Sequence, residues 1–537
     1  MTDFLADPAA PRRSGNEPSI QRIDLGHRTV AGGFFALRRD APARTPFVPE
    51  VFARHDEPYR HCFTYVGGGS TIRRELIDMI DHARTKIFIA ALTLGDKELR
   101  ESLIRAAGRL HGGVYVVSAL DDKGLEEAIN EYDDYPDVDR QLEHRNFREL
   151  TRYGIYVRGY RGLHAKFVVV DDQIALVSSA NLVTASFTTT GENGVVVTNP
   201  ADVDVLARVF ARLWQLSQWD MPPDARNPGS IDKRTGSTRV AAPQPAVSGT
   251  GPIWTWEDRE TDHHIATTIV AIADRAQRDL TLATFSIANI SYPLPRAKTR
   301  PDLLLEPVQR AVQRGVQVRL LMRGRNFLPA ARAEATAFAK AGAQIIPDRS
   351  NHAKGVIADR TLGALFSANF TIPRGLTGGI EVGMRLDGTS ALAEACRYFD
   401  HVMAEANMEF VQDPPLGDLA DTLYAEALTR WPLPRTLPMI AEDRDWRQLA
   451  AEQGVVPYER VGDAVTLYSG NSEWKLRKED STWRLIQERN GQRKDNTSKD
   501  AASIFESWLS GKVPAGTQRG LCPAALVHTD IDLKSDV

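Results

Sequence analysis

The chain has 537 residues, of which 42% are hydrophobic and 25% charged, an ordinary composition for a globular protein of several domains. Its formal net charge of −4 excludes general binding of polyanions, so any such binding needs a local basic patch. The cysteines Cys62, Cys396 and Cys522 are too few and too scattered for a disulfide framework or a cysteine-based zinc site. We find no apolar run of membrane-spanning length and no apolar signal region at the N-terminus. We therefore expect a cytoplasmic location, while export without a signal peptide stays open.

Changes in composition divide the chain into five parts. A polar start rich in Pro and Arg, interrupted only by the apolar stretch 30–37, predicts an extended arm. A stretch dense in Pro, Gly and Ser predicts a linker, and a third boundary falls near Asp413. The predicted parts are an arm at 1–55, a first domain at 56–220, a linker at 221–252, a second domain at 253–412 and a C-terminal module at 413–537.

The two segments that flank the linker share one pattern of elements. The first predicts a helix at 71–83, a strand at 86–92, a helix at 97–109 and a strand at 113–117. The second predicts a helix at 264–276, a strand at 279–285, a helix at 303–313 and a strand at 315–322. A further helix in each half ends at a glycine, Gly154 or Gly342, as helices often do. Short apolar strands between helices predict two similar α/β halves whose sheets are covered on both faces.

A polar motif recurs in both halves at identical spacing. Its members are His164, Lys166, Asp171, Ser179 and Asn181 in the first half, and His352, Lys354, Asp359, Ser367 and Asn369 in the second. A glutamate follows each motif, Glu192 in the first half and Glu381 in the second.

The spacing predicts where these groups point. Histidine and lysine two residues apart share one face of a strand, and serine and asparagine share a face of the next strand. The aspartate falls in a tight turn between the two strands. Each half thus presents three donors to an anion with several oxygens, and one group that can act as nucleophile or acid. Lysine is a poor metal ligand and no carboxylate or histidine cluster has metal spacing, so we expect no metal and no cofactor.

This duplicated pattern resembles the signature of the phospholipase D superfamily over about 56–412. The chain departs from that signature at Ser178 and Phe366, where the family has glycine before the serine. Tyrosyl-DNA phosphodiesterases of the superfamily lack the motif aspartate, whereas both aspartates are present here, so that branch is set aside.

The resemblance implies two sandwich-like halves related by a pseudo-twofold axis, with one active site between them. It implies a metal-independent reaction in which His164 attacks phosphorus to form a phosphohistidine and His352 protonates the leaving oxygen. Glu192 and Glu381 resemble the residues that orient the histidines. Because both half-sites lie in one chain, we expect an active monomer.

Two other segments allow more than one interpretation. An insertion at 119–147 is rich in acidic residues, which predicts either a solvated helix and loop or a lid over the cleft. In the C-terminal module, alternating apolar and polar residues predict a small antiparallel meander, followed by a helix at 501–509. Its aromatic and basic residues either form the core of the meander or bind nucleic acid.

The partner expected from the motif is a phosphodiester substrate. Our leading hypothesis is a nuclease acting on DNA or RNA, with arginines such as Arg158 and Arg161 before the first motif as phosphate contacts. The alternative is a phospholipase D or phosphatidyl transferase, which needs an apolar rim around the site. Candidates for that rim are Phe187, Phe327, Leu328 and Phe370. A third hypothesis is an inactive binding protein on the same fold.

Overall fold

The computed structural model describes residues 32–38, 40–49, 57–65, 69–119, 140–223, 231–234, 243–257, 262–288, 290, 303–326 and 329–414, and strands at 455–461, 464–469, 472–479, 482–489, 492–498 and 518–523. They divide between two compact units. The large unit comprises 40–324 and 334–409, and the small unit comprises the remainder. Both copies of the motif lie in the large unit, so the halves can be compared within one body. The domain boundaries stay predictions.

The first half is built on a ten-stranded sheet with the order β11-β10-β6-β5-β4-β7-β8-β9-β2-β3. Its strands are β2 (Tyr59–Tyr65), β3 (Gly69–Ser70), β4 (Ile87–Ala90), β5 (Val114–Ser118), β6 (Tyr156–Gly159), β7 (Phe167–Val170), β8 (Ile174–Ser178), β9 (Glu192–Val197), β10 (Trp219–Met221) and β11 (Asp232–Lys233). Its helices are α1 (Thr71–Asp81), α2 (Lys97–Ala107), α4 (Arg140–Arg152), α5 (Thr184–Thr188) and α6 (Pro200–Leu216).

The second half is built on an eight-stranded sheet with the order β13-β12-β21-β19-β18-β14-β16-β17. Its strands are β12 (Thr250–Trp256), β13 (Asp262–His263), β14 (Asp279–Thr284), β16 (Gln317–Met322), β17 (Gln344–Pro347), β18 (Gly355–Ala358), β19 (Leu362–Phe366) and β21 (Ile380–Leu386). Its helices are α7 (His264–Arg275), α8 (Leu305–Gln313), α9 (Pro329–Lys340) and α10 (Ser390–Ala404). The short strands β15 (Ile287–Ala288) and β20 (Phe370–Thr371) pair in parallel as a separate two-stranded sheet.

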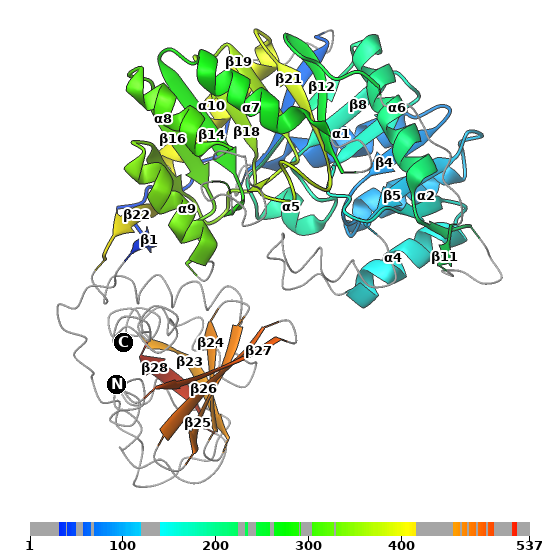
Figure 1. The fold of residues 1–537 in the computed structure, drawn as a ribbon. Helices are drawn as coiled ribbons and strands as arrows, with labels where there is room; N and C mark the ends of the chain where they lie inside the picture. Colours follow the sequence, from blue (N-terminus) through cyan, green and yellow to red (C-terminus); the bar gives the residue numbers. More distant parts are fainter. Residues whose placement is uncertain are drawn as a thin grey trace. The chain divides into compact units, whose positions relative to one another are not determined.

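The two sheets share one topology, which confirms the predicted repeat. Strands β6-β5-β4-β7-β8-β9-β2 of the first sheet correspond in order to β17-β16-β14-β18-β19-β21-β12 of the second. The parallel pairs also match, since β4 pairs with β5 as β14 pairs with β16. Figure 1 shows the two sheets of this unit with helices packed against them. The fold is therefore the α/β class with two similar halves.

Local sequence explains where the helices begin. Ser70 accepts a hydrogen bond from the backbone of Arg73 at the start of α1, and Asp96 accepts one from Leu99 at the start of α2. Such side chains satisfy N–H groups that have no partner inside the helix. At the other end, Gly154 follows α4 with φ +84, a left-handed conformation that glycine adopts without strain.

Strand β7 shows how the sheet is buried on both faces. Phe167 and Val169 join one apolar cluster, while Val168 and Val170 join another on the opposite face. The first cluster is shared by both halves, since it contains residues of α6 and also residues of α10 and β21. Reciprocal packing of α6 on β12 and of α10 on β2 closes this shared core. The inner face of each sheet is therefore buried partly by residues of the other half.

The predicted tight turns join β7 to β8 and β18 to β19. Asp171 and Asp172 have φ near +55, and Asp359 and Arg360 have φ of +51 and +59. Two consecutive left-handed residues are typical of the two-residue hairpin turn that matches strand twist. The hairpins place the start of β7 beside the end of β8, so His164 and Asn181 come to the same end of the sheet.

The departures from the family signature are accommodated by glycines on the neighbouring strand. Ser178 is buried against Gly194, where an added Cβ would lie 2.8 Å from the Ser178 Cβ. Phe366 is buried against Gly383, where an added Cβ would lie 2.5 Å from the Phe366 Cβ. In each half, a glycine on the paired strand thus leaves space for the side chain that stands where the family has glycine before the serine.

The small unit contains a six-stranded antiparallel sheet with the order β27-β26-β25-β24-β23-β28. Its strands are β23 (Val455–Val461), β24 (Ala464–Ser469), β25 (Ser472–Glu479), β26 (Thr482–Arg489), β27 (Gln492–Ser498) and β28 (Gln518–Pro523). Strands β24 to β26 confirm the predicted meander. The strand β1 (Gly33–Leu37) falls inside the apolar stretch of the predicted arm, and β22 (Met408–Gln412) precedes the third boundary.

Some predicted features lie outside the described residues. These are the helix at 501–509, residues 120–139 of the acidic insertion and part of the linker. Within the described ranges, none of the helices is both long and apolar enough to cross a bilayer.

We predict that Gly383→Ala lowers the free energy of unfolding by about 1–3 kcal/mol, because its Cβ would overlap Phe366 and the Leu365 carbonyl oxygen. Chemical denaturation followed by tryptophan fluorescence measures the change. Gly108→Ala is the control, since its Cβ would meet atoms no closer than 3.7 Å. Equal stability of Gly383→Ala and the unaltered protein would contradict the packing described here.

Candidate active site

The two motif histidines lie where the halves are joined by backbone hydrogen bonds. His164 N donates to the carbonyl of Ile380 at 2.9 Å, and His352 N donates to the carbonyl of Gly191 at 2.8 Å. The return bonds run from Ile380 N to Gly162 and from Gly191 N to Ser350. The histidines and lysines precede β7 and β18, so they lie in extended segments next to the strands that were predicted to carry them.

Each histidine is paired with the glutamate of the other half. His164 Nδ1 lies 2.8 Å from Glu381 Oε1, and His352 Nδ1 lies 2.8 Å from Glu192 Oε2. Both pairs are buried, with 11% of the His164 side chain and none of the His352 side chain exposed. The structure therefore brings both histidines and both glutamates to one interface between the halves.

The motif serines hold the glutamates in place. Ser179 Oγ donates to Glu192 Oε2 at 2.5 Å, and Ser367 Oγ donates to Glu381 Oε2 at 2.5 Å. Burial works to raise the pKa of Glu192, but the imidazole of His352, with its hydrogen bond, and the charge of Lys354 hold that pKa below its ordinary value. Glu192 is thus an ionised, fully buried acceptor.

The motif lysines add two buried positive charges to the same interface. Lys166 Nζ donates to the carbonyl of His164 at 2.8 Å, and Lys354 Nζ donates to the carbonyl of His352 at 2.7 Å. Their side chains are as buried as the glutamates. Buried charges need partners of opposite sign, and the charge of Lys354 acts on the buried carboxylate of Glu192.

The motif asparagines are buried at the same end of the hairpins. Asn181 and Asn369 are each 1% exposed. The carboxamide of Asn369 makes no hydrogen bond with the part of the chain that the structure describes. A buried carboxamide of this kind is suited to receive a polar ligand, because leaving it without one is costly.

The structure adds two residues that the motif search did not single out. Asn193 donates to the carbonyl of Lys354 at 3.3 Å and accepts from its backbone N–H at 3.2 Å. The ring centroids of Phe285 and His352 lie 4.6 Å apart. Lys354 Nζ lies 5.4 Å from the centroid of the Phe285 ring. For Asn193 the sequence signal is a difference between the halves, since the second half has Val382 at the corresponding position.

Asp171 and Asp359 lie at the opposite end of the hairpins from the histidines. Asp171 accepts from the backbone N–H groups of residues 84–86, and Asp359 accepts from those of residues 277–279. Burial works to raise the pKa of both carboxyls, but these hydrogen bonds hold each pKa below its ordinary value. The structure therefore does not bring the two aspartates together with the other predicted site residues.

The two arginines expected to contact phosphate before the first motif have different surroundings. Arg158 donates to the carbonyl of Trp214 at 2.7 Å and stacks on its ring, so it is engaged by α6. Arg161 is exposed three residues before His164. Within the described ranges, no three His, Cys, Asp or Glu side chains are grouped so as to hold a metal ion.

Comparison with known proteins places both motifs in a recognised family. The family model described as "Cardiolipin synthase, PLD-like domain" matches residues 76–214 and 269–403. A search of curated proteins found no match.

Solved structures to which this chain is similar include Nuc, a phospholipase D family member from Salmonella typhimurium, with 23% identity and a TM-score of 0.25 over 30% of this chain and 99% of that one. Phosphatidylserine synthase from Haemophilus influenzae has 12% identity and a TM-score of 0.47 over 78% of this chain and 97% of that one. NucT from Helicobacter pylori has 14% identity and a TM-score of 0.23 over 30% and 98%.

We predict that Asp171→Asn lowers the free energy of unfolding by about 1–3 kcal/mol at neutral pH, because a charged acceptor of backbone N–H groups is lost. Since the folded-state pKa of Asp171 is depressed, its stabilisation is present above the unfolded-state pKa of about 3.9 and is lost as pH falls through the folded-state value. Denaturation measured between neutral and acidic pH should show the difference from the unaltered protein shrinking toward low pH.

Asp172→Asn is the matched control, since this neighbour in the same turn forms a partly exposed ion pair with Lys86. A large loss of turnover in Asp171→Asn at unchanged stability would place that carboxylate in the active site instead.

Proposed function

This chain belongs to the phospholipase D-like family, and we propose that it is a metal-independent phosphodiesterase acting on nucleic acid through a phosphohistidine intermediate. The observation that carries the proposal is the reciprocal pairing of His164 with Glu381 and of His352 with Glu192. A carboxylate on Nδ1 fixes the ring tautomer and directs the lone pair of the other nitrogen, Nε2, toward a substrate.

In the proposed first step, His164 Nε2 attacks phosphorus and the bond from phosphorus to the leaving oxygen breaks. His352 gives its Nε2 proton to that oxygen. In the second step His352 takes a proton from water, the resulting hydroxide attacks phosphorus, and the phosphorus–nitrogen bond breaks. His164 is assigned as nucleophile because it is the more exposed of the two, while His352 is fully buried beside an ionised carboxylate that supports its positive charge.

The proposal assigns charge stabilisation to Lys166 and Lys354. Both ammonium groups are buried and fixed by the carbonyl of the histidine two residues before them. Preorganised charges in a site that excludes water stabilise a developing phosphorane without reorganisation. Ser179 and Ser367 then act through the glutamates that they bind, and Asn181 and Asn369 are proposed as donors to phosphoryl oxygens.

A nucleic acid is favoured over a phospholipid by the position of the apolar candidates. Phe187 and Phe370 are buried in the protein, 3% and 0% exposed, so they do not form a rim for acyl chains. Phe327 and Leu328 lie outside the described residues. Arg161, exposed close to His164, is instead a suitable contact for a neighbouring phosphate.

We predict that His164→Ala and His352→Ala each abolish hydrolysis of a phosphodiester, and that the double variant is no less active than either, because the two act as one unit. Lys166→Met and Lys354→Met should each lower kcat about 100-fold or more. Steady-state rates in the presence of EDTA provide the measurement. Activity that depends wholly on added magnesium would contradict the metal-independent mechanism.

The substrate class is tested with the His352→Ala protein, which should bind without turnover. Binding to DNA should weaken with salt, with a slope of about −0.9 per phosphate neutralised for duplex, and Arg161→Ala should reduce that slope by about one. Titrations at several salt concentrations measure it. Absence of binding to single or double strands, together with hydrolysis of phosphatidylcholine vesicles by the unaltered protein, would favour the phospholipase alternative.

A further inference from the structure

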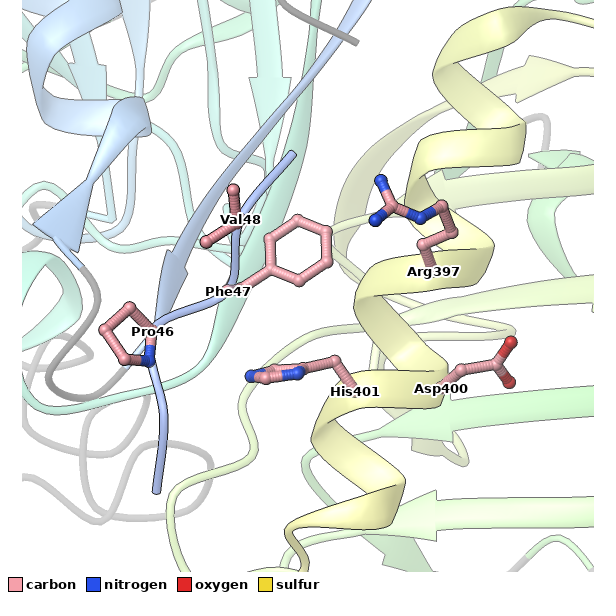
Figure 2. A pocket seen from close by; sticks show the side chains of 6 residues that line it. All are labelled: Pro46, Phe47, Val48, Arg397, Asp400 and His401. Atoms are coloured by element: carbon pink, nitrogen blue, oxygen red, sulfur yellow. The ribbon is translucent and has the colours of Figure 1, made fainter. Parts of the chain in front are cut away.

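Within the large unit, a segment that precedes the first half is held against α10 and β2 by polar and aromatic contacts. Thr45 N donates to Glu405 Oε1 at 3.0 Å, and the carbonyl of Thr45 lies 3.0 Å from His401 Nε2. Phe47 is 5% exposed and packs edge to face on Phe63, with ring centroids 4.9 Å apart. Figure 2 shows the Phe47 ring directed at α10, between Arg397 and His401. We call residues 44–48 the strap.

The first residue of the strap forms an ion pair with a buried carboxylate. Arg44 NH2 lies 2.5 Å from Asp348 Oδ2, and Asp348 has only 1% of its side chain exposed. Arg44 NH1 also donates to Tyr65 OH at 3.3 Å, and that hydroxyl donates to Glu405 at 2.7 Å. Burial works to lower the pKa of Arg44, but the charge of Asp348 raises it above the ordinary value.

Asp348 begins the turn that leads into His352. Its Oδ1 accepts from Ser350 N at 2.8 Å, which fixes the turn. The carbonyl of Ser350 accepts from Gly191 N at 2.7 Å, and the carbonyl of Gly191 accepts from His352 N at 2.8 Å. Gly191 directly precedes Glu192, the carboxylate that binds the His352 imidazole. The Arg44–Asp348 ion pair and these three hydrogen bonds therefore connect Arg44 to both members of the His352–Glu192 pair.

We infer that Arg44 is a positioning residue of the active site, which through Asp348 holds the turn 348–351 and thereby the His352–Glu192 pair in its reactive arrangement. The inference rests on the proposed function for the step that this pair performs. The turn before His164 is packed differently, since its Gly162 lies against Gly379 and its Tyr160 lies edge to face on Trp256.

The charge of Asp348 explains why Arg44 is needed. An almost completely buried carboxylate is strongly destabilised when its partner is removed, and the structure responds by moving or hydrating it. Movement of Asp348 releases Ser350 and hence Gly191. A displacement of about 1 Å at a reacting group is enough to reduce turnover about 100-fold.

Helix α10, which faces the strap, provides a matched control. A pocket of about 400 Å³ lies between the strap and α10, lined by Pro46, Phe47, Val48, Arg397, Asp400 and His401 (Figure 2). Arg397 lies 5.9 Å from the Phe47 ring and pairs with Glu394 on its own helix. Arg397→Ala therefore removes an arginine that lies over the strap and is paired within its own helix.

The experiment compares Arg44→Ala, Arg44→Lys, Asp348→Asn, the Arg44→Ala/Asp348→Asn double variant and Arg397→Ala in the full-length protein. With bis(p-nitrophenyl) phosphate as substrate, we expect Arg44→Ala to lower kcat about 10- to 100-fold with little change in KM. Arg44→Lys should recover part of the loss. The double variant should be no worse than Arg44→Ala, because it removes the unpaired carboxylate. Arg397→Ala should behave as the unaltered protein.

A second readout does not depend on turnover. NMR titration of the His352 imidazole in ¹⁵N-histidine-labelled protein, assigned by the signal lost in His352→Gln, should show a shifted midpoint in Arg44→Ala and none in Arg397→Ala. If the unaltered protein cleaves no phosphodiester and this shift is seen, the proposed function fails and the positioning role stands. If the protein is active but Arg44→Ala changes neither kcat nor the titration, the inference is overturned.

Losses in kcat that multiply in the double variant would also overturn it. If Arg44→Ala does not fold, as judged by circular dichroism, the same comparisons are made with Arg44→Lys and Asp348→Asn, which keep the size of each side chain.

Discussion

The hydrogen bond from each motif histidine to the glutamate of the opposite half is the interaction on which the site depends. His164 with Glu381 and His352 with Glu192 cross the same interface in opposite directions. Because each pair takes one member from each sheet, neither half contains a complete pair. Isolated backbone bridges at Leu163 and Gly191 also join one half to the other. The side-chain pairs and these backbone bridges therefore lie at the same interface between the halves.

The burial of four charged groups explains the density of hydrogen bonds around them. Lys166, Lys354, Glu192 and Glu381 all lie in the interior. Each lysine donates to a carbonyl, and each glutamate accepts from a serine and an imidazole. Such a network is stable only when its members are satisfied and mutually balanced. The shared apolar core between the sheets supplies the rigidity that keeps this network closed to solvent.

The sequence was sufficient for the features that depend on local pattern. Apolar runs, a glycine after a helix, and an aspartate between two strands predict elements and turns because their causes lie within a few residues. The repeat then predicted two equivalent sheets. The grouping of the motif aspartates with the proposed catalytic residues was less informative, since Asp171 binds backbone N–H groups at the far end of its hairpin.

The remaining features depend on contacts between distant parts of the chain. Spacing alone cannot say that Glu381 binds His164, because the partner is chosen by how the halves pack. It also cannot say that Gly383 makes room for Phe366, since that contact is set by strand register. Arg44 was assigned to an arm with no expected role, and its partner Asp348 follows more than 300 residues later.

The separation of each pair along the chain has a consequence for synthesis. Glu381 follows His164 by 217 residues and His352 follows Glu192 by 160 residues. Because translation proceeds from the N-terminus at about 5–20 residues per second, the first half leaves the ribosome well before its partner carboxylate exists. Closure of so long a loop comes late in folding. A nascent chain therefore carries only separated halves of the site, and the site is complete only when the second half has emerged and docked.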